Sequence, residues 1–406
     1  MWRLTRYAVL FAVFATLAGC MTATAGAAEA AMPTAAAIPT AAANAAPSWA
    51  AAQSSRSPGW RITQVLAGAA IGGLWADGAR DAWLAGDECA DPATCGTGDA
   101  GDGTVVVRHW DGKAWRVVTA PSAYINSPLE QGVAAVAATS ASNAWVLAAR
   151  GSESVDYTDA LHWTGQRWTA PFRLDAAIQA AVAPSATQLW AFGQSKVNGQ
   201  PGYFAHFNGQ DWTHGSFPLN GTAAAARSAS DVWVGGGTAD GLGIEHWDGR
   251  GWHVTPLPNL GLGSGSALRL FAEIFGFVDL GLDNVWADIG VLNATGANPP
   301  GTVILHWNGK AWSRVKFPYV GDAMTPAAYD GHGGIWLVTV DGTGRNVTLW
   351  LDHYSGRHWT RVKVPRRNGG QPEMDNLSWI PGTHSLWATG GVNFADNGEA
   401  ILKYGG

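Results

Sequence analysis

The stretch His109-Trp110-Asp111-Gly112-Lys113-Ala114-Trp115 decides the fold, because the chain repeats its pattern five more times. The other copies are HWTGQRW from His162, HFNGQDW from His206, HWDGRGW from His246, HWNGKAW from His306 and HYSGRHW from His353. In each copy Asp, Asn, Thr or Ser precedes Gly, which favours a two-residue type I′ turn between antiparallel strands. The copies therefore predict six β-hairpins, with the indoles on one face and His on the other.

A second signature precedes every hairpin: a polar or small residue, then an apolar residue, and then Trp. Its seven tryptophans are Trp83, Trp145, Trp190, Trp233, Trp286, Trp336 and Trp387. A segment rich in small residues comes before each, so the unit has four strands. Units of this size and strand number are typical of propeller blades.

The seventh unit stops before its fourth strand, and Gly59-Trp60-Arg61-Ile62 at the front matches the missing strand. The sequence therefore predicts an all-β, seven-bladed β-propeller of four-stranded antiparallel blades. An N-terminal strand joins the C-terminal blade, which closes the ring and removes its exposed sheet edges.

These motifs resemble bacterial exported proteins built from repeats of the DVW…HWDGxxW type, within the broad superfamily of kelch, galactose-oxidase-like and related propellers. The resemblance covers about Trp60 to Gly406. It implies a blade architecture and offers no catalytic residues to carry over. The Gly-Gly, Tyr and Trp spacing of kelch repeats and the Asp-box of sialidases are absent.

Composition narrows the function classes. The chain has 406 residues and a formal net charge of −6, and 14% of its residues are charged. Such an acidic balance excludes a protein that tracks phosphate backbones, so we expect no nucleic-acid partner. With 47% hydrophobic residues, 53 Gly and 23 Trp, the chain has ample material for a core of short strands.

The N-terminus reads as an export signal. Arg3 and Arg6 precede a short apolar run, and Leu17-Ala18-Gly19-Cys20 resembles the lipobox of bacterial lipoproteins. We predict a signal peptide over 1–19, a lipid on Cys20, an Ala/Thr/Pro-rich tether over 20–58 and the propeller over 59–406. The predicted location is the bacterial cell envelope, with the lipid anchor as the sole membrane contact. Ordinary secretion, with cleavage near Ala25-Gly26-Ala27, is the alternative.

Two cysteines remain if Cys20 carries lipid. Cys89 and Cys95 lie six positions apart, and an oxidising compartment favours a small disulfide loop between them. A metal-binding pair is the weaker interpretation, because no second pair completes a four-ligand site.

The repeated His and Trp side chains suggest packing over chemistry. One His per blade, on the third strand from the axis, places these rings too far apart to share one ion. We expect each His to bond to a neighbouring blade, and the tryptophans to pack between blades.

Binding residues are expected where the repeats differ, in the loops between second and third strands and between blades, which share one face. The candidate ligand-binding residues are Asp87, Glu88, Asp99, Asp102, Tyr124, Asp156, Tyr157, Asp159 and Asp396. Clustered carboxylates also suit Ca²⁺, but Asp99-Ala100-Gly101-Asp102-Gly103 has no EF-hand spacing, and we predict no cofactor or metal site.

The fifth unit carries an insertion between Leu257 and Asp283. Apolar residues at 267, 270, 271, 274 and 275 follow a helical stripe, which predicts a short capping helix or, alternatively, a longer inner strand. An exposed Phe patch there would be a protein-contact site.

The sequence thus predicts a monomeric, lipid-anchored envelope propeller that is a non-catalytic binding or assembly module for a protein or glycan. No catalytic residues are assigned. The alternative is a carbohydrate-active enzyme, a glycosidase or lyase with acidic loop residues at the channel mouth.

Overall fold

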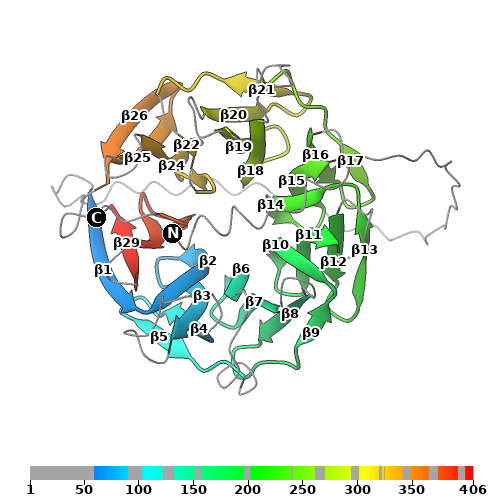
Figure 1. Cartoon of the computed structure of the whole chain (residues 1–406), viewed down its shortest axis with the longest axis vertical. Coiled ribbons are helices and arrows are strands. Elements are labelled where there is room, and N and C mark those ends of the chain that lie inside the picture. Colours follow the sequence, from blue (N-terminus) through cyan, green and yellow to red (C-terminus); the bar gives the residue numbers. More distant parts are fainter. Residues whose placement is uncertain are drawn as a thin grey trace, which may run out of the picture. The chain divides into compact units, whose positions relative to one another are not determined.

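The computed structural model shows seven antiparallel sheets arranged in a ring (Figure 1). The described residues are 59–89, 103–121, 132–150, 157–195, 202–238, 241–260, 270–293, 301–319, 322–323, 325–341, 348–364, 374–391 and 398–405. The predicted seven-bladed propeller is confirmed.

Each blade runs from an inner to an outer strand. The first blade holds β2 (Ala69–Gly78), β3 (Asp81–Cys89), β4 (Gly103–Trp110) and β5 (Trp115–Val118), and the second β6 (Gly132–Ser140), β7 (Asn143–Arg150), β8 (Tyr157–Trp163) and β9 (Phe172–Leu174). The third holds β10 (Ala176–Ser185), β11 (Gln188–Ser195), β12 (Gly202–Phe207) and β13 (Trp212–Phe217), and the fourth β14 (Asn220–Ser228), β15 (Asp231–Thr238), β16 (Gly241–Trp247) and β17 (Trp252–Val254).

The remaining blades vary this plan. The fifth holds β18 (Leu270–Asp279), β19 (Val285–Asn293), β20 (Gly301–Trp307) and β21 (Trp312–Val315). The sixth has two short inner pieces, β22 (Asp322–Ala323) and β23 (Ala328–Tyr329), then β24 (Ile335–Asp341), β25 (Thr348–Ser355) and β26 (His358–Lys363). The seventh holds β27 (Asn376–Trp379), β28 (Leu386–Gly391), β29 (Gly398–Tyr404) and β1 (Trp60–Ala67).

The ring closes as the sequence predicts. β1 pairs with β29 as the outer strand of the seventh blade, and Trp60 lies opposite Tyr404. This pairing repeats that of Trp110 with Trp115 in the first blade. The two ends of the body therefore share one sheet.

The hairpin turns differ from the expected two-residue form. Trp110 pairs directly with Trp115, so the loop has four residues, and the Asp111 carboxylate accepts hydrogen bonds from the Lys113 and Ala114 N–H groups. Gly112 adopts a φ of 90°, whereas Asp111 keeps a negative φ. The side-chain bonds replace the second left-handed residue that a type I′ turn needs. The indoles still share one face, as predicted.

The sixth hairpin alone of the described six has the two-residue loop. Ser355 pairs with His358, and both intervening residues are left-handed, Gly356 with a φ of 56° and Arg357 with a φ of 71°. These are the signs of φ that a type I′ turn requires.

The fifth blade settles the helix-or-strand alternative. Residues 270–279 form β18, paired with β19, so the helix is wrong for this segment. Pairing with a neighbouring strand satisfies the backbone groups at the inner position, which the 3.6-residue periodicity does not reveal. Residues 261–269 lie outside the described part.

Small residues on the inner strands let the blades converge. A Cβ atom at Gly72 would lie 1.7 Å from the carbonyl oxygen of Val133 in the next blade. No larger residue fits there, which explains the small-residue segments of the repeat.

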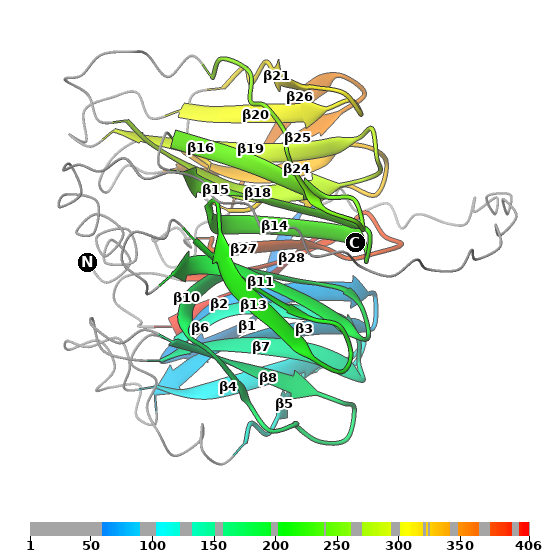
Figure 2. The ribbon, with the colours of Figure 1, turned by 90° about the vertical axis from the view of Figure 1, so that its right-hand side faces the viewer.

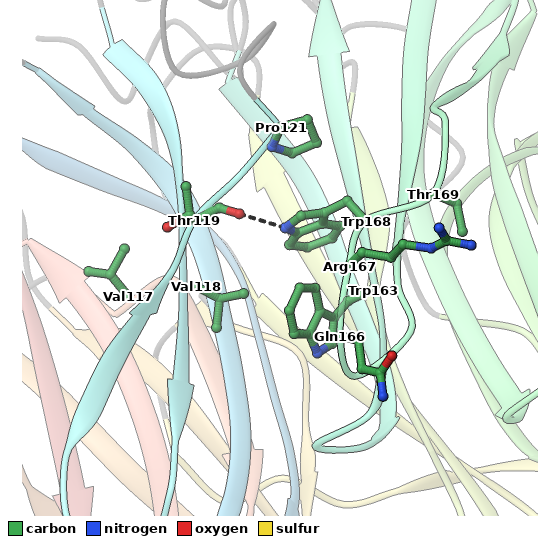
Figure 3. A pocket seen from close by; sticks show the side chains of 9 residues that line it. All are labelled: Val117, Val118, Thr119, Pro121, Trp163, Gln166, Arg167, Trp168 and Thr169. Atoms are coloured by element: carbon green, nitrogen blue, oxygen red, sulfur yellow. Dashed lines mark hydrogen bonds between the residues drawn. The ribbon is translucent and has the colours of Figure 1, made fainter.

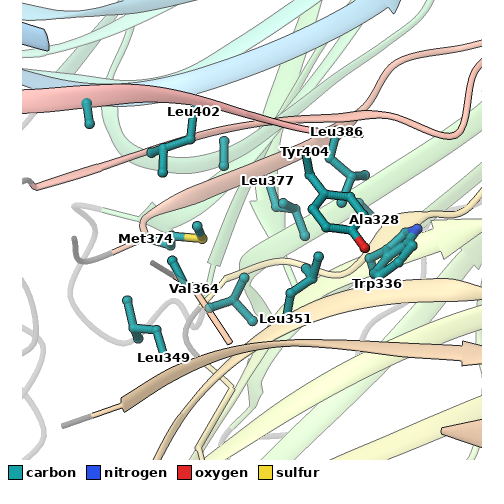
Figure 4. Packing of buried hydrophobic residues seen from close by; sticks show 13 residues of the cluster. Ala328, Trp336, Leu349, Leu351, Val364, Met374, Leu377, Leu386, Leu402 and Tyr404 are labelled. Atoms are coloured by element: carbon teal, nitrogen blue, oxygen red, sulfur yellow. The ribbon is translucent and has the colours of Figure 1, made fainter. Parts of the chain in front are cut away.

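The core lies in the seams between blades. In the seam between the sixth and seventh blades, Leu349 and Leu351 of β25 pack with Leu386 of β28 and Leu402 of β29 (Figure 4). Such burial of apolar surface holds neighbouring blades together.

Two faces result from the antiparallel order. The connections between second and third strands and between blades share one edge, here called the loop face, and the tight turns share the other, the hairpin face (Figure 2). On the loop face the spacing varies: thirteen residues separate β3 from β4, and two separate β15 from β16.

Candidate functional site

Five of the six repeated His residues belong to an internal pair, and the buried Nε2 atom of His206 in the third blade has no hydrogen-bond partner among the described residues. The His246 Nε2 atom lies 2.8 Å from Oδ1 of Asp231 on the same blade, and its ring stacks on Trp233 at 4.1 Å. The equivalent pairs are His109 with Asp81, His162 with Asn143, His306 with Asn284 and His353 with Asp330. The expectation of a bond to a neighbouring blade is therefore wrong. The partner is the Asp or Asn that precedes Trp at the start of the second strand of the same sheet, and in the sixth blade Asp330, in the turn before that strand, takes its place.

Burial sets the electrostatics of these pairs. Desolvation lowers the pKa of His162, which faces a neutral Asn, to about 4. At Asp231 burial opposes ionisation, but hydrogen bonds from His246 and Arg227 outweigh it and hold the pKa below its usual range. These pKa shifts thus arise from burial and hydrogen bonds within one blade.

The repeated aromatic residues pack between blades, as predicted. Trp387 of the seventh blade contacts Trp110 and Trp115 of the first at ring distances of 5.1 and 5.3 Å. Across the seam between the sixth and seventh blades, Tyr404 contacts Trp336 at 5.2 Å. Each of these contacts joins one blade to the next.

Two predicted binding residues are described in the first blade, Asp87 and Glu88 on β3. Glu88 forms an ion pair with Arg108 of β4, and its side chain is 24% exposed. The Asp87 carboxylate lies against the backbone of the second blade, because a Cβ atom at Gly132 would be 2.8 Å from its Oδ1 atom. These carboxylates thus belong to the strand end at the loop face.

The second blade brings two further predicted residues together with two arginines. Asp159 is buried and lies 3.6 Å from Arg150 and 4.0 Å from Arg173. The guanidinium of Arg173 covers the Tyr157 ring at 3.7 Å. Arg173 is 59% exposed, so this group presents a cation over an aromatic ring at the loop face.

The other predicted residues lie outside the described part of the chain. They are Asp99, Asp102, Tyr124, Asp156 and Asp396, together with Cys20 and Cys95. Cys89 ends β3, and its disulfide with Cys95 stays a prediction. Within the described ranges no group of three or more His, Cys, Asp or Glu side chains could hold a metal ion.

The arginines are what the sequence analysis missed. Arg108, Arg150 and Arg173 lie 20, 9 and 14 residues from their acidic partners, and they meet only through strand pairing. The register of the paired strands brings these arginines to their partners; Asp159, for example, pairs directly with Arg173.

A second overlooked group lies at the hairpin face between the sixth and seventh blades. His332 and His384 stack at 4.1 Å, and with Asp330, His353 and Ser355 they line a pocket of about 240 Å³. The sequence signal is turn length: two residues join the first and second strands in the first four blades, but five do so in the fifth and sixth and six in the seventh. Asp330 here replaces the Asp or Asn of the repeat, so the pocket is built largely from packing residues.

Three carboxyl groups of the fifth blade are buried. Burial raises the pKa of Glu273 and of Asp279 to about 7, and for Asp279 the nearby Asp231 adds to the rise. Asp288 is fully buried, its pKa is likewise raised to about 7, and its Oδ1 atom accepts the Ala327 N–H of the sixth blade at 3.0 Å. Asp288 thereby replaces a ladder bond where the inner strand of the sixth blade is interrupted.

Within the described ranges we find no helix of the length and apolarity needed to cross a membrane.

Comparison with known proteins supports the fold alone. No protein-family model matches the chain, and no curated protein matches it significantly. Among solved structures, the β-propeller domain of the Trilobed protease from Pyrococcus furiosus has a TM-score of 0.53 and 7% identity, covering 84% of this chain and 94% of that one.

A weaker likeness is to the Aleuria aurantia lectin, with a TM-score of 0.42 and 14% identity, covering 74% of this chain and 97% of the lectin. The N-terminal domain of Nup159 has a TM-score of 0.45 and 9% identity, covering 87% of this chain and 97% of that domain. The chain is thus similar to β-propeller proteins, and these likenesses assign no family.

Proposed function

We propose that this protein is a lipid-anchored envelope β-propeller that acts as a non-catalytic binding or assembly module for a protein or glycan. The partner binds the loop face. The observation that carries the proposal is where the blades differ: the repeated His, Asp and Trp side chains are used inside the ring, whereas connection length varies from blade to blade on the loop face. A rigid scaffold with variable loops is a common design for recognition.

The described carboxylates support a module over a glycoside-cleaving enzyme. A glycosidase needs two carboxyl groups that flank one bond. Glu88 and Asp159 are instead each engaged in an ion pair with arginine. Arg173 with Tyr157 offers a cation and an aromatic ring, which suit an acidic or polar partner.

A ligand screen tests the binding function. The full chain is heated with Ca²⁺, with chelator and with a panel of envelope glycans, and the unfolding temperature is followed. A ligand at about 100 times its dissociation constant stabilises the fold by about 2.7 kcal/mol. We expect a responding acidic glycan to lose about tenfold in affinity with Arg173→Gln, because a charge-assisted contact is lost.

Arg250→Gln, on the opposite hairpin face, is the matched control and should leave that affinity unchanged. Equal effects of both substitutions would argue against the loop face. Turnover of a glycan in the same screen would favour the enzyme.

The anchor has a separate test. Cys20→Ser removes the thiol that would carry the lipid, so we expect the protein to leave the membrane fraction and to lose acylation. Met21→Ser, beside it, should retain both. Continued acylation and membrane retention of the Cys20→Ser protein would show that the anchor assignment is wrong.

A further inference from the structure

The seam between the first and second blades lacks a contact that the other six described seams share. In those six, the buried Trp of one blade meets a hairpin aromatic ring of the next at 5.1 to 5.5 Å. Trp83 instead makes its described ring contact with His109 of its own blade at 4.6 Å, and its Nε1 donates to the Ser140 carbonyl. The hairpin rings Trp163 and Trp168 pack against the same buried cluster as Trp83, but this seam lacks the ring-to-ring contact of the others.

The local sequence explains the opening. Trp163 and Trp168 form an isolated bridge, the Thr169 N–H still donates to the His162 carbonyl, and β9 begins only at Phe172. Pro171 lies in this gap and has no N–H for the strand ladder. A groove of about 690 Å³ results between β5 and the second-blade hairpin, on the outer wall (Figure 3).

The two indoles are fixed before any ligand arrives. Trp168 Nε1 donates to the Thr119 carbonyl at 2.8 Å, and Trp163 Nε1 donates to the Ala141 carbonyl at 3.2 Å. Both rings are only half-buried, so apolar ring surface remains open to the groove. Rings held in place lose little freedom on binding.

The polar residues that line the groove carry a single positive charge. Arg167 is the single charged residue among the lining side chains, beside the amide of Gln166 and the hydroxyl of Thr169. Its guanidinium makes no ion pair with another described residue. A lone cation in a chain of net charge −6 favours an anionic ligand at this place.

We propose that this groove binds an acidic oligosaccharide, one that contains uronic acid. The C–H face of a sugar ring packs on the indole surface, the hydroxyls bond to Gln166 and Thr169, and the carboxylate pairs with Arg167. The site lies on the outer wall, separate from the loop face. It therefore goes beyond the proposed function and does not depend on a loop-face partner.

A proline-rich peptide is the competing occupant, because such peptides also dock on aromatic grooves. It gives no role to Arg167. The cation and the polar side chains around the indoles favour the saccharide.

Calorimetric titration of the full chain tests the proposal. The probes are a tetragalacturonate, a neutral galactose tetrasaccharide and a decaproline peptide, at low salt. We expect binding of the uronate and at least about tenfold weaker binding of the neutral sugar. Arg167→Gln should weaken the uronate by about tenfold, while Arg250→Gln, on the fourth-blade hairpin, leaves it unchanged.

Other outcomes overturn the proposal. These are no uronate binding at millimolar concentration, equal binding of the neutral sugar, preference for decaproline, or equal losses in both arginine variants. Arg173→Gln separates this site from the loop face: if it abolishes uronate binding and Arg167→Gln does not, the saccharide binds the loop face and the groove is not its site.

Discussion

Trp233→Ala should lower the free energy of unfolding by about 3–5 kcal/mol, the range for a large buried aromatic residue. Trp233 is fully buried, stacks on His246 and meets Trp307 and Trp312 of the next blade at 5.5 Å. Its Nε1 donates to Asp231 at 3.1 Å. Alanine leaves a cavity in the seam and removes this bond as well. Urea denaturation followed by circular dichroism measures the loss.

Two controls separate the causes. Trp233→Phe keeps a ring in the seam but loses the Nε1 bond to Asp231, so its cost should be smaller than that of alanine. Leu282→Ala changes a side chain that is 64% exposed and should shift stability by less than about 0.5 kcal/mol. If Trp233→Ala lost no more stability than Leu282→Ala, the ring contacts of Trp233 with the next blade would not be what stabilises this seam.

The fold was predictable because one local pattern recurs. The Asp-Gly hairpins and the Trp of the second strand fix strand number and order, and Trp60 completes the last blade. Finer geometry was not predictable. A side chain such as Asp111 can replace a left-handed residue in a turn, and the dipeptide alone does not distinguish the two solutions.

The candidate site was predictable only in position. The sequence places Glu88 and Asp159 at the loop face, where they are found, but it shows carboxylates without their arginines. The partners come from strand pairing, which depends on register. The opening between the first and second blades accompanies the late start of β9 at Phe172, and it also involves Trp83, which looks like every other copy in the sequence.

Asp288→Asn should stabilise the protein relative to the wild type as pH rises. Asp288 is fully buried and has a raised pKa of about 7, against an ordinary value of 3.8. A raised pKa means that the folded state prefers the protonated acid. Its contribution to stability is therefore complete below pH 3.8 and is lost as pH rises through 7. Asn is neutral at every pH and can still accept the Ala327 N–H.

The expected result is a difference between variant and wild type that grows by about 2–3 kcal/mol from pH 5 to pH 8. The wild type alone does not isolate the effect of Asp288, because burial also lowers the pKa of His162 to about 4. The contribution of His162 to the stability of the protein is lost as pH falls below 6.5. Glu273 and Asp279 titrate in the same way in both proteins, so the difference isolates Asp288.

Denaturation at several pH values measures this difference, and Leu282→Ala, which changes no titratable group, should differ from the wild type by a constant amount. A pH-independent difference for Asp288→Asn would mean that the buried carboxyl is ionised in the fold. The hydrogen bond from Ala327 to Asp288, which joins the fifth and sixth blades, would then have a charged acceptor. Acidification, and not a rise in pH, would weaken that bond and open the seam.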